Sequence, residues 1–189
     1  MRGLGDSSPF GLSMVVFETC FDHAPQKGGV RRIAMELTGT VSSGLGRAHV
    51  FMAQPHYQEQ FRALLGKTAW PGTLNVNVEG TNLVEYIALR KKSGIDTLDA
   101  SDEHRQSASE VDVSAFEAHR IRGFLRDGVS FGGATAFKAT FKTSSGTVPC
   151  AILIPDLTRH IDVVEVIADA CLRECFNLED GAVVQIELK

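Results

Sequence analysis

The chain is 189 residues long, which is enough for one domain with a buried core. Hydrophobic residues make up 43% and charged residues 22%, as in an ordinary globular protein. A formal net charge of −4 gives no basic field for nonspecific binding to nucleic acid or to an anionic membrane. No apolar run approaches the roughly 20 residues of a membrane helix. We therefore expect a cytoplasmic protein that holds any anionic ligand with local groups: backbone amides, a few arginines or a metal ion.

The first part of the chain divides into an extension and the start of a folded domain. Residues 1–30 are rich in Gly, Ser and Pro, which predicts a weakly ordered N-terminal extension, and the domain then covers 31–189. Apolar residues alternate with polar ones at 33–37, and this two-residue period predicts a strand. The alternation resumes at 48–52 after a glycine-containing turn, so a second strand is expected there.

Two helices follow with clear start and stop signals. Pro55 suits a first helical turn, apolar residues recur on one face of 55–65, and Gly66 suits the C-terminal stop. A turn and a short alternating strand at 74–78 come next, before a second helix at 82–92. From 93 to 114 the sequence then turns polar and acidic with few apolar anchors, and we interpret about 80–117 as an insertion in the domain.

The second half of the sequence is mostly strand. Asp169 can cap a short helix, and Asn177 suits its left-handed stop. Short β-rich segments separated by Gly or Ser turns lie at 121–125, 134–141, 148–154, 163–167 and 183–188. Many short strands with two or three short helices predict a mainly β fold, a small closed barrel rather than a parallel α/β sheet.

Three groups of polar or glycine residues could carry chemistry. Gly44 and Gly46 would let backbone amides converge on an anion, although a plain hairpin turn has the same pattern. Thr73 and Asn75 share one face at the start of a strand, where neutral oxygens could hold a hydrated Mg²⁺, or could simply stabilise the turn. Glu165 stands among apolar strand residues, so it either faces solvent or lines a pocket.

The order and spacing of four motifs resemble the CTP-dependent riboflavin kinase family. They are Ser-Gly-Leu-Gly at 43–46, Gly66 with Pro-Gly-Thr-Leu-Asn at 71–75, Ile-Arg-Gly-Phe at 121–124, and Leu-Arg leading to Asp-Gly at 172–181. The resemblance covers about 33–80 and 118–188. It implies a six-stranded cradle-loop barrel.

The resemblance also implies a set of site residues. Thr73 and Asn75 match the Mg²⁺ ligands, Thr158 the contact to the flavin phosphate, and Glu165 the acidic residue at the ribityl end of the flavin, where it is the candidate catalytic group. Two stretches match the nucleotide contacts: Gly44, Leu45, Gly46, Arg47, Ala48, His49 and Val50, and then Ala170, Cys171, Leu172 and Arg173. In the first stretch the family usually has an acid and a glycine where this chain has Arg47 and Ala48.

The implied reaction transfers the γ-phosphoryl group of CTP to the 5′-hydroxyl of riboflavin, giving FMN and CDP with Mg²⁺ as cofactor. The expected protein is a monomer or small homo-oligomer. Two alternatives stay open at this point. One is a related kinase with a different acceptor or nucleotide, which the altered glycine loop would permit. The other is a non-catalytic barrel that binds flavin or nucleotide, since a fold does not fix a function.

Overall fold

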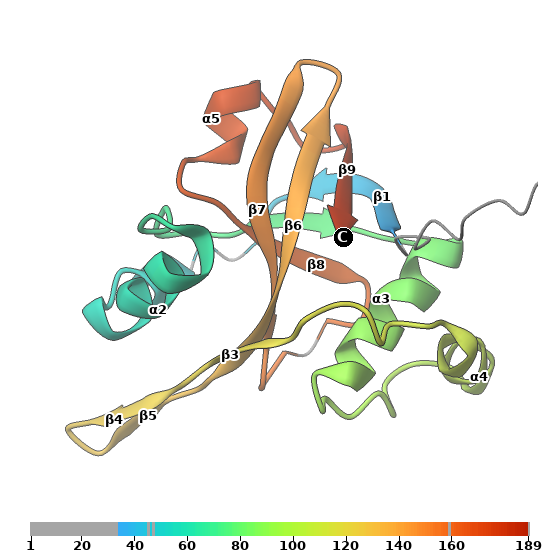
Figure 1. Cartoon of the computed structure of the whole chain (residues 1–189), viewed down its shortest axis with the longest axis horizontal. Helices are drawn as coiled ribbons and strands as arrows, with labels where there is room; N and C mark the ends of the chain where they lie inside the picture. Colours follow the sequence, from blue (N-terminus) through green and yellow to red (C-terminus); the bar gives the residue numbers. More distant parts are fainter. Residues whose placement is uncertain (1–33, 45, 47, 159, 189) are drawn as a thin grey trace, which may run out of the picture. The chain divides into compact units, whose positions relative to one another are not determined.

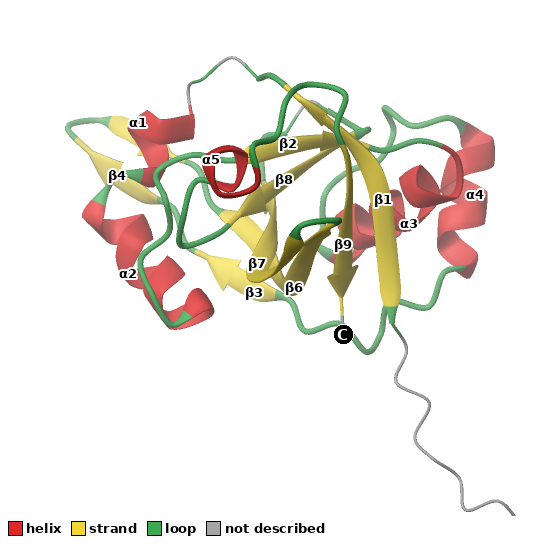
Figure 2. Cartoon of the chain, turned by 90° about the horizontal axis from the view of Figure 1, so that it is seen from above, coloured by secondary structure: helices red, strands yellow, loops and turns green. Residues whose placement is uncertain are grey.

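Six strands close into an antiparallel barrel (Figures 1 and 2). The computed structural model describes residues 34–188 except 45, 47 and 159, so the expected extension at 1–30 lies outside the described residues. Around the barrel the strands are β6 (Ala134–Thr143), β7 (Gly146–Pro155), β8 (Val163–Ile167), β2 (Leu74–Asn77), β1 (Met35–Ser42) and β9 (Val183–Leu188). The ring closes where β9 pairs with β6. The predicted mainly β, six-stranded closed barrel is confirmed.

Alternating burial explains why these segments form the barrel wall. In β9, Val184, Ile186 and Leu188 are buried while the residues between them are more exposed. The same alternation places Met35 and Leu37 of β1 in the interior. Because these apolar side chains meet inside a closed ring, the barrel buries one continuous core and leaves no free edge between its strands.

The long strand β6 has two neighbours on the same edge. Its residues 139–142 pair with β9 and close the barrel. Its first residues, 134–136, pair instead with β3 (His119–Ile121), which lies outside the ring. A small hairpin, β4 (Phe124–Arg126) and β5 (Val129–Phe131), projects beyond β3 (Figure 1). The expected single strand at 121–125 is therefore split at Gly123, because the chain leaves β6 and turns to pair with β5.

Helices lie on opposite sides of the barrel (Figure 2). One side carries α1 (Ala48–Met52) and α2 (Pro55–Leu65), the other α3 (Gly80–Lys92) and α4 (Asp102–Glu110), and α5 (Leu172–Phe176) lies near β7 in Figure 1. The predicted start and stop of α2 are confirmed, since Pro55 is its first residue and Gly66 has a φ of 79°. The predicted left-handed stop of α5 at Asn177 is also confirmed, with a φ of 48°. No helix among the described residues is long and apolar enough to cross a membrane.

Two local expectations were wrong. Residues 48–52 form α1 instead of a strand, because β1 already has β2 on one side and β9 on the other. A further strand here would have no barrel edge to pair with. Asp169 does not cap α5, whose N-cap is Cys171 without a side-chain hydrogen bond. Its carboxylate instead pairs with Lys67, with 2.8 Å between Nζ and Oδ2.

The segment between β2 and β3 has more internal anchors than its polar composition indicates. The predicted helix at 82–92 is α3, which buries Tyr86 and Arg90. The Arg90 guanidinium pairs with Asp99, with 3.0 Å between Nη2 and Oδ2. Helix α4 was not expected because Ala108 is its one buried residue, which leaves no apolar period to detect.

Candidate active site

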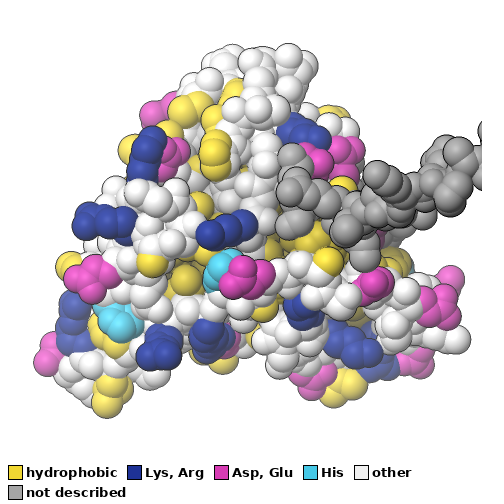
Figure 3. Space-filling model, in the orientation of Figure 1, with side chains coloured by type: hydrophobic (Ala, Val, Ile, Leu, Met, Phe, Trp, Pro, Cys, Tyr) yellow, Lys and Arg dark blue, Asp and Glu magenta, His cyan; other side chains and the backbone are white. Residues whose placement is uncertain are grey.

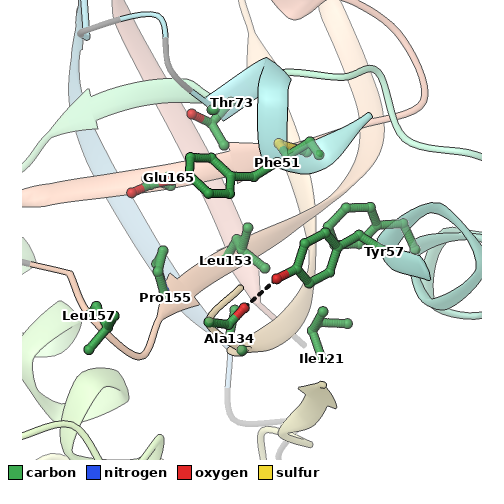
Figure 4. Close-up of a pocket in the computed structure, with 14 residues that line it drawn as sticks. Phe51, Tyr57, Thr73, Ile121, Ala134, Leu153, Pro155, Leu157 and Glu165 are labelled. Atoms are coloured by element: carbon green, nitrogen blue, oxygen red, sulfur yellow. Dashed lines mark hydrogen bonds between the residues drawn. The ribbon is translucent and has the colours of Figure 1, made fainter. Parts of the chain in front are cut away.

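A cavity of about 300 Å³ opens at the end of the barrel beside α1 and α2 (Figure 4). Its wall comes from these helices, from the ends of β3, β6 and β7, and from the middle of β8. Most of this wall is apolar: it includes Phe51, Tyr57, Phe61, Ile121, Leu153 and Pro155. Thr73 and Glu165 give it one polar end. Such a cavity suits a ligand with a flat apolar body and a polar tail.

Glu165 points into this cavity, which decides between the two alternatives left open by its sequence. In β8 its neighbours Val164 and Val166 are fully buried on the other side of the strand. Burial raises the pKa of the Glu165 carboxyl to about 7. Within the described part of the chain its carboxylate has no hydrogen-bond or ion-pair partner. It is therefore available to accept a hydrogen bond from a ligand.

Thr73 and Asn75 lie next to Glu165. Thr73 follows the turn at 70–72, and its Oγ1 donates to Asn75 Oδ1 over 3.3 Å. Asn75 is the cross-strand neighbour of Glu165 in the register of β2 and β8. The turn and the strand therefore place two neutral oxygens beside one carboxylate. No cluster of three His, Cys, Asp or Glu side chains suited to a metal exists among the described residues.

The loop after β1 passes directly over Asn75. A Cβ atom at Gly44 would lie 2.5 Å from Asn75 Nδ2, so a larger residue would require the loop or the Asn75 amide to move. Gly46 has a φ of 66°, which also favours glycine. Ala48 lines the cavity, His49 binds the Gly46 carbonyl through Nδ1 at 2.8 Å, and Val50 is half exposed. Leu45 and Arg47 lie outside the described residues.

A second, smaller cavity of about 70 Å³ lies between the turn at 70–72 and the start of α5. The stretch Ala170, Cys171, Leu172 and Arg173 forms one side of it, and Gly72 and Thr73 lie on the other. The Trp70 amide donates to the Ala168 carbonyl over 2.8 Å and fixes the two segments together. Thr73 is thus a wall residue of both cavities.

The guanidinium of Arg173 binds the end of β1, where the glycine loop begins. Its Nη2 donates to the Ser42 carbonyl over 2.9 Å and to Asp180 Oδ1 over 2.7 Å. Hydrogen bonds from Ser43 and then from Arg173 lower the pKa of Asp180 below its ordinary value. These contacts join α5 to the end of β1, so one side of the second cavity is fixed to the loop that crosses Asn75.

Thr158 does not line the main cavity, although its neighbour Leu157 does. Its amide donates to the Pro155 carbonyl over 3.1 Å, which forms a turn at the cavity rim. Leu157 is 82% exposed at this rim. The structure therefore brings Thr73, Asn75, Gly44 and Glu165 into one place, and leaves Thr158 beside the entrance.

Several wall residues were missed by the sequence analysis. Tyr57 and Phe61 were placed on the apolar face of a helix, which is correct, but that face also borders the cavity. The Tyr57 hydroxyl donates to the Gly132 carbonyl over 2.5 Å. Burial and then the Asp156 carboxylate raise the pKa of Tyr57 above its ordinary value. The consecutive glycines 132 and 133 are a signal of close backbone approach that could have indicated this wall.

Comparison with known proteins gives the same family as the four sequence motifs. The family model CTP-dep_RFKase, described as a domain of unknown function, DUF120, matches residues 41–113 and 96–188. The chain belongs to the CTP-dependent riboflavin kinase family. These two matches cover the barrel strands from Val41 onward, together with both cavities.

The curated relatives that the chain matches are riboflavin kinases from archaea. The riboflavin kinase of Thermoplasma acidophilum is 34% identical over 152 residues, and that of Methanoculleus marisnigri is 35% identical over 153 residues. Each alignment covers 80% of this chain and 56% of the relative. The riboflavin kinase of Haloquadratum walsbyi is 31% identical over 157 residues, which are 82% of this chain and 57% of the relative. The chain therefore spans little more than half the length of these relatives.

Proposed function

We propose that the protein phosphorylates the 5′-hydroxyl of riboflavin, with CTP as donor and Mg²⁺ as cofactor, to give FMN and CDP. One observation carries the proposal: an aromatic-walled cavity ends at a half-buried carboxylate, unpaired among the described residues, beside two neutral oxygen side chains. Membership of the riboflavin kinase family supports the substrate.

The cavity suits the two chemically different ends of riboflavin. The flat isoalloxazine ring would lie against the apolar wall that includes Phe51, Tyr57 and Leu153. The ribityl chain would extend to the polar end at Thr73 and Glu165 (Figure 4). In this arrangement the reacting hydroxyl lies where the donor phosphates must also arrive.

Glu165 would orient the attacking hydroxyl. Its ionised carboxylate accepts a hydrogen bond from the 5′-hydroxyl and takes the proton as the bond to phosphorus forms. A pKa of about 7 suits this role, since ionised and protonated forms are both accessible near neutral pH. Phosphoryl transfer needs little covalent chemistry from a protein, so positioning by the walls supplies most of the remaining catalysis.

The donor nucleotide would lie on the other side of Thr73. Its phosphates would meet backbone amides within 44–50, that is, in the glycine loop and the first turn of α1. Its base would meet Ala170 to Arg173 at the second cavity. Thr73 and Asn75 fit Mg²⁺ because they supply two adjacent neutral oxygens and leave the other positions to phosphate and water. The ion would neutralise charge on the phosphate oxygens during transfer.

An assay of FMN formation tests the proposal. The protein is incubated with riboflavin, Mg²⁺ and each of the four nucleoside triphosphates in turn, and FMN is separated and measured. We expect FMN with CTP and loss of at least 100-fold in rate for Glu165→Gln. FMN formed with another nucleotide would identify a related kinase with a different donor. Tight flavin binding without FMN under any condition would identify a non-catalytic binding barrel.

A steric variant tests which cavity holds the flavin. A Cβ atom at Gly132 would make ordinary contact with Leu157, 3.8 Å away, so Gly132→Ala narrows the main cavity without disturbing its wall. The matched variant Gly72→Ala acts on the second cavity, where the nearest atoms are 3.4 Å away on the Trp70 ring. We expect Gly132→Ala to raise the KM for riboflavin and Gly72→Ala to raise that for the nucleotide. The reverse result would exchange the two assignments.

A further inference from the structure

A bidentate ion pair between Arg120 and Asp156 joins β3 to the end of β7 at the entrance of the main cavity. Arg120 Nη1 donates to Asp156 Oδ1, and Arg120 Nη2 donates to Asp156 Oδ2. The Arg120 side chain is 51% exposed and that of Asp156 30% exposed. Neither side chain takes part in the proposed phosphoryl transfer. That reaction therefore does not explain why the ion pair lies beside the cavity.

The surroundings of the pair are built to accommodate it. The Asp156 amide donates to the Gly133 carbonyl over 3.0 Å, so both its backbone and its side chain are held. A Cβ atom at position 133 would lie 2.9 Å from Asp156 Oδ2 and 2.8 Å from the Ile121 carbonyl. Only glycine leaves room for the pair here. The guanidinium also lowers the pKa of the Asp156 carboxyl below its ordinary value, which keeps it ionised.

The pair fixes the first residue of a turn that borders the cavity. The turn runs through Asp156 and Leu157 and is closed by the bond from the Thr158 amide to the Pro155 carbonyl. Leu157 lines the cavity although most of its side chain is exposed. Because an exposed leucine makes few contacts of its own, the position of this rim depends on how Asp156 is anchored.

We infer that Arg120 and Asp156 are positioning residues that hold the rim turn at 156–158 against the flavin, and that they set flavin affinity rather than the rate of transfer. The inference rests on the proposed function. Since the turn ends at Thr158, the residue expected beside the flavin phosphate, the pair affects FMN more than riboflavin. An exposed ion pair contributes little to folding, so its effect on stability is small.

The test compares Arg120→Ala and Arg120→Lys with a matched control, Lys67→Ala. The control breaks another exposed ion pair, Lys67 to Asp169, away from the rim. Lysine keeps the charge of Arg120 but cannot form the bidentate hydrogen bonds, so Arg120→Lys should retain only part of the flavin affinity. The measurements are the Kd of riboflavin and FMN from flavin fluorescence, kcat, both KM values, the melting temperature, and hydrogen exchange at the Leu157 and Thr158 amides.

We expect Arg120→Ala to weaken FMN binding about tenfold and riboflavin binding about threefold, as loss of a charge-assisted contact at a partly exposed site would do. Exchange at the two amides should be faster, while kcat, the nucleotide KM and the melting temperature stay close to those of Lys67→Ala. Unchanged exchange and unchanged flavin affinity, in a protein that does phosphorylate riboflavin, would overturn the inference alone. A wild-type protein that neither binds nor phosphorylates riboflavin would overturn the proposed function, and the exchange rates would still decide whether Arg120 holds the turn.

Discussion

At the scale of single residues, the half-buried carboxylate of Glu165 links stability to pH. Its pKa in the folded protein is about 7, against an ordinary value of 4.5. Between these values the folded state holds a proton that the unfolded state has lost, so this contribution to stability is complete below pH 4.5 and falls as pH rises to 7. The free energy of unfolding of Glu165→Gln, relative to that of wild type, should therefore rise by about 2 kcal/mol from pH 4.5 to pH 8.

Urea unfolding of both proteins at several pH values measures this difference. The exposed carboxylate Glu110, at the end of α4, provides the control. Glu110→Gln makes the same chemical change at an exposed position and measures the effect of the substitution itself. A constant gap between Glu165→Gln and wild type from pH 4.5 to pH 8 would mean that Glu165 is not held in a desolvated place.

Thr73 and Asn75 give a second prediction at this scale. Thr73→Ala and Asn75→Ala should each raise the Mg²⁺ concentration needed for half-maximal activity about tenfold, because in the proposed site each would remove one direct oxygen ligand. Asn77→Ala is the matched control, since Asn77 is an exposed amide two residues further along the same face of β2. Titration with Mg²⁺ at saturating riboflavin measures the effect. Equal behaviour of Asn75→Ala and Asn77→Ala would remove Asn75 from the metal site.

At the scale of elements, the glycine loop depends on its approach to β2. Gly44→Ala places a Cβ atom 2.5 Å from Asn75 Nδ2, so the loop or the amide has to move. We expect a rise of about tenfold or more in the KM for the nucleotide, with riboflavin affinity unchanged, because in the proposed arrangement the loop would lie on the nucleotide side of Thr73. Steady-state kinetics and flavin fluorescence measure the two quantities separately. A rise confined to the riboflavin KM would place the loop against the flavin instead.

Elements whose apolar residues recur with a regular period and end at a clear stop signal could be predicted from the sequence. Elements that lack either feature could not. Helix α2 has Pro55 at its start and Gly66 at its end, and β9 alternates along its whole length. Residues 48–52 also alternate, but over only three apolar positions, and a closed barrel has no edge for them. Whether a short apolar run forms a strand depends on free partners, which are set by the topology and not by the run itself.

At the scale of the whole molecule, closure of the barrel depends on the core where β6 meets β9. Phe141 is fully buried there, opposite Ile186. Phe141→Ala should lower the free energy of unfolding by about 3–5 kcal/mol, from lost transfer energy and the cavity left behind. Leu125→Ala, on the projecting hairpin with 72% of its side chain exposed, should change it by less than about 0.5 kcal/mol. Urea unfolding of both variants tests whether β6 and β9 form one cooperative unit.

The surface and the site differ in how far the sequence could predict them. Figure 3 shows Lys and Arg side chains interspersed with Asp and Glu on one face of this chain, whose net charge is −4. Thr73, Asn75 and Glu165 could be named because polar residues next to turns and within apolar strands stand out. Tyr57 and Leu153 could not, since a cavity wall and a core have the same apolar pattern. Only the fold shows which side of an apolar residue is left open.

The position of Thr73 between the two cavities bears on the kinetic mechanism, that is, on whether both substrates bind before the phosphoryl group is transferred. One side chain borders both spaces, so acceptor and donor would lie in contact, and both would have to be bound before reaction. Such a ternary complex transfers the phosphoryl group directly, without a phosphorylated enzyme in between. Initial-rate plots at several fixed riboflavin concentrations should therefore intersect, and a donor with chiral γ-phosphorus should give FMN of inverted configuration. Parallel lines with retained configuration would mean that the wall at Thr73 separates two successive half-reactions.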